Sequence, residues 1–171
     1  MSYKLKLRNI STFMFDVDGV LTNGDVTVMG DQMLRTLYAK DGYALQYAAK
    51  LGYKIFIITG GNSQDIKDRL LKLGIQEVHL RSGNKLEVYL DIVKRHQLQN
   101  EEVLYMGDDI PDIRVMNTVQ VAACPQDAVA EIKSISDYHS PYNGGKGCVR
   151  DVIEQTLKVQ SKWMLEEAHH W

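Results

Sequence analysis

Thr12-Phe13-Met14-Phe15-Asp16-Val17-Asp18-Gly19 is a short apolar run that ends in two acidic residues and a glycine. An apolar run of this length indicates a β-strand. In open parallel sheets the ligand crevice lies beyond the carboxyl ends of the strands. We therefore expect Asp16 to lie at the rim of a pocket.

The same pattern continues along the chain, where short apolar runs alternate with amphipathic stretches. This alternation is typical of an α/β protein, a parallel sheet covered by helices. The run Ile55-Phe56-Ile57-Ile58 is mostly β-branched, as in a central strand buried on both faces. Asn62 or Ser63 is expected to cap the helix that follows it, and Gly74 to end that helix. We predict strands at 12–15, 54–58, 77–80 and 103–106, and helices at 43–50, 63–73 and 85–96.

Residues 22–38 interrupt this alternation. Val26 and Val28 are spaced as in a strand, and they precede the turn-forming pair Gly30-Asp31. This pattern predicts a β-hairpin flap between the first strand and the first helix, over about residues 22–40.

The composition indicates one globular domain over residues 1–171. Charged residues make up 25% of the chain, hydrophobic residues 44%, and the net charge is −2. Nothing in this balance favours nucleic acid or a membrane as a partner, and no stretch approaches the ~20 apolar residues of a membrane span. Cys124 and Cys148 lie outside any metal-binding spacing, which favours a reducing cytoplasm over a disulfide framework.

A second acidic cluster follows the run 103–106. Asp108 and Asp109 come directly after Gly107, and Asp112 lies four residues beyond Asp108. A single Asp after a strand is most often a helix cap, but two such clusters at equivalent strand ends bring their carboxylates to one edge of the sheet. This concentration of negative charge calls for a cation, and hard oxygen ligands suit Mg²⁺.

Two other segments would attract an anion rather than a cation: Thr59-Gly60-Gly61-Asn62 and Lys85. The first segment follows a strand and opens a helix, so its hydroxyl and amides could hold a phosphate, and Lys85 adds a positive charge. Each signal is weak alone, but together with the acids they make up the parts of phosphoryl transfer. Asp16 would attack phosphorus, and Asp18 would protonate the leaving oxygen and later activate water.

These segments resemble the four ordered motifs of the haloacid dehalogenase superfamily of phosphatases. The resemblance rests on residues 16–22, Thr59, Lys85 and residues 107–112, and it spans most of the chain. It implies a Rossmann-like, doubly wound domain with helices on both faces of the sheet. The implied roles are nucleophile for Asp16, acid and base for Asp18, phosphate binding for Thr59, Gly60 and Lys85, Mg²⁺ binding for Asp16, the backbone carbonyl of Asp18 and Asp108, and support for Asp109 and Asp112.

Superfamily members normally carry a cap domain after the first or second motif, and the spacing of the motifs here leaves no room for one. Within the superfamily the chain is similar to the capless 3-deoxy-D-manno-octulosonate 8-phosphate (KDO 8-phosphate) phosphatases. The similarity lies in residues 18–24, 40–43, 58–60 and 144–150. This family implies a cytoplasmic homotetramer in which the flap hairpins build a barrel between subunits, and residues of an adjacent subunit, together with a C-terminal tail, close the pocket. The implied reaction releases KDO and phosphate for lipopolysaccharide biosynthesis.

The family resemblance also implies substrate contacts from Asn23, Gly24 and Arg69, with Arg69 reaching the sugar carboxylate in a neighbouring subunit. The alternative for Arg69 is a solvated helix residue. Many relatives carry Thr-Gly-Arg where this chain has Thr59-Gly60-Gly61, so the phosphate of a nine-carbon acid, sialic acid or its deaminated analogue, is an alternative substrate. The tail 161–171 is expected to be frayed or to lie over a neighbour's pocket.

A receiver domain of two-component signalling is the alternative from another class, because it also combines a doubly wound sheet with an acidic Mg²⁺ pocket, a Thr and a Lys. In a receiver the phosphorylated Asp stands alone after the third strand. Here the pair Asp16 and Asp18 comes first, and the cluster 107–109 comes last, after Thr59 and Lys85. A catalytically silent binding protein is a weaker alternative, because every motif residue is present.

Overall fold

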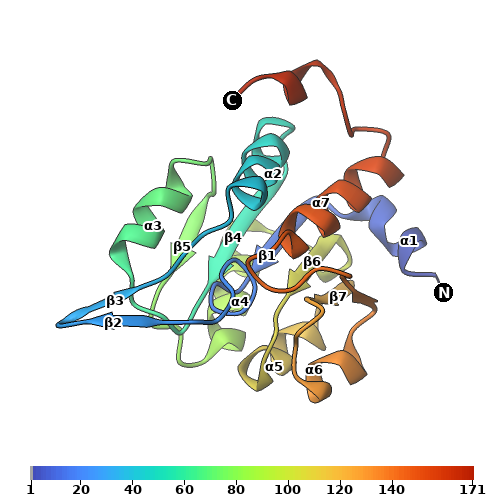
Figure 1. Cartoon of the computed structure of the whole chain (residues 1–171). Helices are drawn as coiled ribbons and strands as arrows, with labels where there is room; N and C mark the ends of the chain where they lie inside the picture. The colour runs from blue at the N-terminus through green and yellow to red at the C-terminus, as the bar shows by residue number, and fades with distance from the viewer. Residues whose placement is uncertain (1) are drawn as a thin grey trace.

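The computed structural model of this chain describes residues 2–171, and a six-stranded parallel sheet forms its centre. The strand order is β5-β4-β1-β6-β7-β8 (Figure 1). The chain runs from β1 outward to β5 and then returns to β6 on the other side of β1, so the topological switch point lies beside β1. The strands are β1 (Thr12–Phe15), β4 (Lys54–Ile58), β5 (Glu77–His79), β6 (Val103–Met106), β7 (Val121–Cys124) and β8 (Tyr138–His139).

Helices cover both faces of the sheet, which confirms the predicted α/β class (Figure 1). The α2, α3 and α7 helices share one core, and α4, α5 and α6 share the other. Strand side chains alternate between these cores, so that Phe13 and Phe15 face the first and Met14 the second. The helices are α1 (Tyr3–Lys6), α2 (Ala39–Lys50), α3 (Gln64–Leu71), α4 (Lys85–His96), α5 (Ile113–Met116), α6 (Ala130–Ile135) and α7 (Cys148–Val159), with 3₁₀ turns η1 (Leu7–Asn9), η2 (Asn100–Glu102), η3 (Ile110–Asp112) and η4 (Glu166–His169).

Every predicted strand and helix is present, although some ends differ. The first predicted helix begins earlier than expected, at Ala39. Its first turn, Ala39-Lys40-Asp41-Gly42, carries no apolar periodicity, and so the sequence pattern does not mark it. The hydroxyl of Ser63 accepts a hydrogen bond from the amide of Ile66 and caps α3, as predicted. The apolar pattern does not predict β7 or β8, because the side chains of β7 are small and β8 has only two residues.

The predicted flap is the antiparallel hairpin β2 (Thr27–Met29) and β3 (Gln32–Leu34), which extends away from the sheet (Figure 1). All six residues of its two strands are exposed. Between β1 and β4 the chain forms only this flap and α2, and between β4 and α4 only α3 and β5. Residues 2–171 therefore contain no cap domain at either insertion point.

The C-terminal tail packs against the chain's own α2 helix, which corrects the expectation of a frayed end, whereas the alternative, a cover for a neighbour's pocket, stays a prediction. The hydroxyl of Tyr43 donates a hydrogen bond to the carbonyl of Ala168, and the ring of Trp171 contacts the Tyr43 ring edge-on. Trp163 contacts Tyr47 in the same way. These edge-on aromatic contacts, together with the hydrogen bond of Tyr43, hold the tail on α2, although Trp171 itself stays 72% exposed. No helix among residues 2–171 is both long and apolar enough to span a membrane.

Candidate active site

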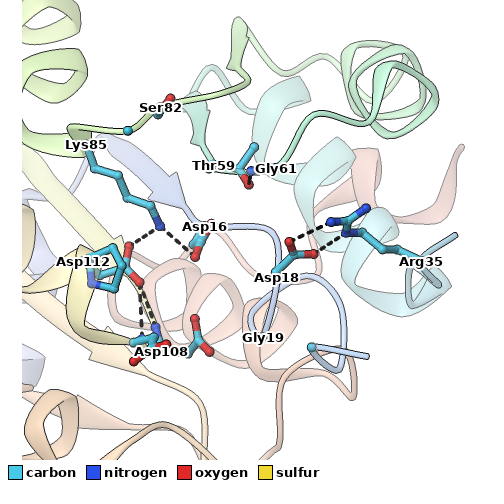
Figure 2. A pocket seen from close by; sticks show the side chains of 15 residues that line it. Asp16, Asp18, Gly19, Arg35, Thr59, Gly61, Ser82, Lys85, Asp108 and Asp112 are labelled. Atoms are coloured by element: carbon cyan, nitrogen blue, oxygen red, sulfur yellow. Dashed lines mark hydrogen bonds and ion pairs between the residues drawn. The ribbon is translucent and has the colours of Figure 1, made fainter. Parts of the chain in front are cut away.

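Three strands end at the same level and bring the residues that follow them to one rim. Phe15, the last residue of β1, pairs with Ile57 of β4 and with Met106 of β6. The loops beyond these strands line a pocket of about 580 Å³, and Asp16 and Asp108 are two of its acids (Figure 2). The parallel register therefore places the strand-end residues together.

Lys85, the first residue of α4, points into this pocket (Figure 2). Its Nζ lies 2.8 Å from Oδ2 of Asp16 and 2.7 Å from Oδ1 of Asp112. All three side chains are at least nine-tenths buried. Because a buried charge is tolerated only when it is paired, the two carboxylates hold the ammonium group in place.

Asp112 is a fully buried residue with both side-chain oxygens engaged. Its Oδ1 accepts hydrogen bonds from Lys85 and from the hydroxyl of Tyr105 at 2.6 Å. Its Oδ2 accepts from the backbone amides of Asp108 and Asp109 at 3.2 and 3.4 Å. Asp112 thus orients Lys85 and the loop after β6, which is the geometry of a supporting acid.

The acids of the pocket repel one another. Burial and the charge of Asp112 raise the pKa of Asp16 to about 6, although Lys85 acts in the opposite direction. Burial and the charges of Asp16 and Asp112 raise the pKa of Asp108 to about 7. For Lys85, burial alone would lower the pKa, but the two carboxylates outweigh it and the pKa is raised. Negative charge is therefore in excess at this rim.

The acids form a group that could hold a metal ion. Asp16, Asp108 and Asp112 each bring one carboxylate oxygen within 4.8 Å of the others. Each oxygen of Asp112 accepts two hydrogen bonds, whereas each oxygen of Asp16 has one such partner, Val17 N for Oδ1 and Lys85 Nζ for Oδ2, so Asp16 and Asp108 are the two acids better placed to bind a cation. Hard oxygen donors with an excess of negative charge fit a divalent ion such as Mg²⁺.

The loop after Asp16 turns around a glycine. The carbonyl of Val17 accepts hydrogen bonds from three amides of this turn. Gly19 has a φ of +81°, and a Cβ atom there would lie 2.0 Å from Oδ2 of Asp108. Only glycine meets both demands, and the resulting turn lets Asp18 line the same pocket.

Thr59, Gly60 and Gly61 line another part of the pocket, as the loop between β4 and α3. Thr59 is buried, and its Oγ1 accepts a hydrogen bond from the amide of Gly61 at 3.0 Å. A hydroxyl that accepts from an amide still has its own proton to donate, for example to a phosphate oxygen. The geometry is that of an anion-binding loop.

Three other residues named from the sequence, Asn23, Asp109 and Arg69, lie at the rim of this pocket or outside it. Asn23 is exposed and donates a hydrogen bond to Asp25, whereas its neighbour Gly24 lines the pocket. Asp109 lies on the rim, where it accepts a hydrogen bond from the next amide. Arg69 lines a separate hollow of about 140 Å³, and its predicted contact with a neighbouring subunit stays a prediction.

Arg35 is a pocket residue that sequence reasoning missed. Its Nε and Nη2 donate hydrogen bonds to the two carboxylate oxygens of Asp18, at 2.6 and 3.2 Å (Figure 2). The residue follows the flap within Leu34-Arg35-Thr36, and no motif or spacing there marks it. The position of Arg35 at the base of the flap, directly after β3, brings its guanidinium to Asp18.

Comparison with known families and sequences places the chain among phosphatases. The model of the haloacid dehalogenase-like hydrolase family matches residues 27–119. The 3-deoxy-D-manno-octulosonate 8-phosphate phosphatase KdsC of Escherichia coli K12 is 34% identical over 165 residues, which cover 95% of this chain and 86% of that protein.

Solved structures of 3-deoxy-D-manno-octulosonate 8-phosphate phosphatases are also similar to this chain. The 3-deoxy-D-manno-octulosonate 8-phosphate phosphatase of Yersinia pestis superimposes with a TM-score of 0.90 at 30% identity, over 93% of this chain and 86% of that one. The enzyme of that name from Moraxella catarrhalis, solved with a magnesium ion, a phosphate ion and KDO, has a TM-score of 0.90 at 28% identity, over 94% and 92% of the two chains.

Proposed function

The chain belongs to the haloacid dehalogenase-like hydrolases, in the branch of the KDO 8-phosphate phosphatases, and from this membership we propose that it hydrolyses KDO 8-phosphate to KDO and inorganic phosphate. The observation that carries the proposal is the buried contact of Lys85 with Asp16 at the end of β1. This contact holds a carboxylate and an ammonium group together at the switch point of the sheet, where ligands bind. The product sugar would serve lipopolysaccharide biosynthesis.

In the first proposed step, a carboxylate oxygen of Asp16 attacks phosphorus while the bond from phosphorus to the sugar oxygen breaks. Lys85 and Thr59 stabilise the charge that spreads over the phosphoryl oxygens, together with the amide of Gly60. Asp18 donates a proton to the leaving sugar oxygen. Asp16, the carbonyl of Asp18 and Asp108 would hold Mg²⁺, which, when bound, neutralises the phosphate charge.

In the second step, water attacks the phosphorus of the aspartyl phosphate. Asp18 now accepts a proton from this water, the bond from Asp16 to phosphorus breaks, and phosphate leaves. Asp16 returns as a carboxylate and Asp18 as an acid, so both groups are ready for another turnover. Asp109 and Asp112 support the loop that carries Asp108.

We further propose that the single domain of residues 1–171 works as a homotetramer with its pocket completed by a neighbouring subunit. The exposed flap supports this, because Val28 and Met33 face each other across the hairpin and are 68% and 61% exposed. Exposed apolar side chains on a two-stranded hairpin call for a partner. Cys124 and Cys148 are free and buried, which supports the proposed cytoplasmic location.

The second candidate substrate is the phosphate of a nine-carbon sugar acid. Gly61 favours it, because this chain lacks the arginine that many KDO 8-phosphate phosphatases carry at that position. Family membership excludes the receiver-domain hypothesis, since the haloacid dehalogenase-like model covers the segment from the flap to the loop after β6.

The decisive experiment is phosphate release with Mg²⁺ across eight-carbon and nine-carbon 2-keto-3-deoxy acid phosphates, hexose phosphates and nucleotides. We expect the highest kcat/KM for KDO 8-phosphate and loss of activity with a chelator, restored by Mg²⁺. A preference for a nine-carbon acid would keep the chemistry and replace the substrate. Weak activity on all of them would overturn the substrate proposal.

A further inference from the structure

Arg35 ties the flap to the catalytic loop. The residues of β2 and β3 are all exposed, whereas the Arg35 side chain, directly after β3, is only 9% exposed. Its guanidinium lines the same pocket as Asp16 and Asp18. An arginine side chain buried to this degree is stable only when its donors are paired.

The pairing of Arg35 with Asp18 is asymmetric. Nε donates to Oδ1 at 2.6 Å, and Nη2 donates to Oδ2 at the longer distance of 3.2 Å. Nη1 donates to the carbonyl of Met33, which fixes the guanidinium plane to the flap backbone. Oδ1 is therefore the firmly held oxygen, and Oδ2 is the one held less tightly.

Gly61 borders the space beside this pair. A Cβ atom at position 61 would lie 3.3 Å from Oγ1 of Thr59, 3.5 Å from Oδ2 of Asp18 and 3.7 Å from Nη2 of Arg35. A long side chain at this position would therefore reach the space that the guanidinium of Arg35 fills. The same distances place Oδ2 of Asp18 on the side of the phosphate-binding loop.

We propose that Arg35 is a positioning residue for Asp18, and that Gly61 leaves the room this arginine needs. Nε holds Oδ1, which can accept a hydrogen bond whether or not the carboxyl group carries a proton. Oδ2 is then the oxygen that gives its proton to the leaving sugar oxygen and later takes one from water. The inference rests on the acid and base role of Asp18 in the proposed function.

The leaving group separates this role from a merely structural one. A sugar alkoxide is a poor leaving group and needs the proton of Asp18, whereas 4-nitrophenolate leaves without one. The value of kcat/KM reports the steps up to formation of the aspartyl phosphate and is therefore the quantity to compare.

The test measures kcat/KM of Arg35→Ala with KDO 8-phosphate and with 4-nitrophenyl phosphate. We expect a loss of about 30-fold with the sugar phosphate and less than about threefold with the aryl phosphate. Arg35→Lys keeps the charge but not the paired donors, so it should recover only part of the loss. Arg114→Ala, an exposed arginine on α5, is the matched control and should change neither value.

A double-mutant cycle with Gly61→Leu tests the second half of the proposal. The leucine should displace the guanidinium, so Gly61→Leu should reproduce the leaving-group selectivity of Arg35→Ala, and the double variant should be no worse than either single one. Circular dichroism checks that each variant is folded.

Equal losses with both phosphates, or losses that multiply in the double variant, would overturn this inference and leave the proposed function intact. A wild-type chain that is inactive with both phosphates would overturn the proposed function and the inference together.

Discussion

Two sides of the pocket are built in different ways: the sheet side, which includes Lys85 and Asp112 beside the ends of the strands, and the flap side, which consists of β2, β3 and Arg35. On the sheet side, Lys85 and Asp112 are buried, and each is held by several partners from different elements. On the flap side, β2 and β3 expose every residue, and within residues 2–171 the hydrogen-bond partners of the Arg35 side chain are Asp18 and the flap's own backbone.

This difference indicates how the two sides divide the work. Groups that carry charge in a transition state need fixed positions, and the ends of packed strands provide them. A two-stranded hairpin has no core of its own, so its position depends on what it contacts. We therefore expect changes on the sheet side to abolish chemistry or stability, and changes on the flap side to alter assembly and substrate preference.

The largest effect is expected from Asp16→Asn. The amide cannot act as the nucleophile, so kcat should fall at least about a thousandfold, while the fold is kept. Phosphate release measures kcat, and circular dichroism checks that the variant keeps its fold. Asp25→Asn, an exposed flap carboxylate, is the control. Activity within tenfold of wild type would show that Asp16 is not the nucleophile.

Asp112→Asn is expected to damage stability as well as turnover. It removes one of the two carboxylates that pair with the buried Lys85 and puts an NH₂ group where buried groups donate hydrogen bonds, at a cost of about 1–3 kcal/mol in the free energy of unfolding. Urea unfolding measures this cost. Asp65→Asn is the matched control, because Asp65 is an exposed carboxylate outside this pocket and the change should cost less than about 1 kcal/mol. Equal costs for both would contradict the supporting role of Asp112.

The flap is tested by replacing its facing apolar pair, Val28→Glu with Met33→Lys. Opposite charges keep the hairpin paired but prevent apolar contact with a second copy, so the tetramer should dissociate in sedimentation. We expect kcat/KM for KDO 8-phosphate to fall about tenfold with little change in the stability of each subunit. Leu90→Lys, an exposed leucine on α4, should leave the assembly unchanged. A wild-type chain that sediments as a monomer would refute the assembly proposal.

Arg69→Ala is expected to have the most selective effect, on the KM of one class of substrate and not on assembly or stability. If Arg69 reads a sugar carboxylate in a neighbouring pocket, KM should rise about tenfold for a carboxylated sugar phosphate and stay unchanged for an aryl phosphate. Lys72→Ala, an exposed cation directly after α3, serves as the control. Equal changes with both substrates would show that Arg69 is a solvated helix residue.

The sequence alone determined the α/β class, the predicted strands and helices, and the family. These follow from local patterns: the apolar run before Asp16, the β-branched run 55–58 and the order of the four motifs are all readable without contacts. Because parallel strands in register end together, even the meeting of Asp16 and Asp108 could be anticipated.

The tertiary structure alone decided the partner of each charge. Asp112 and Tyr105 meet because a turn follows β6, the tail covers α2 through aromatic contacts, and Arg35 reaches Asp18 from the base of a hairpin, directly after β3. None of these contacts has a spacing that repeats or a residue type that demands it. They arise from packing between segments distant in sequence, and for this reason Arg35 became visible only in the folded chain.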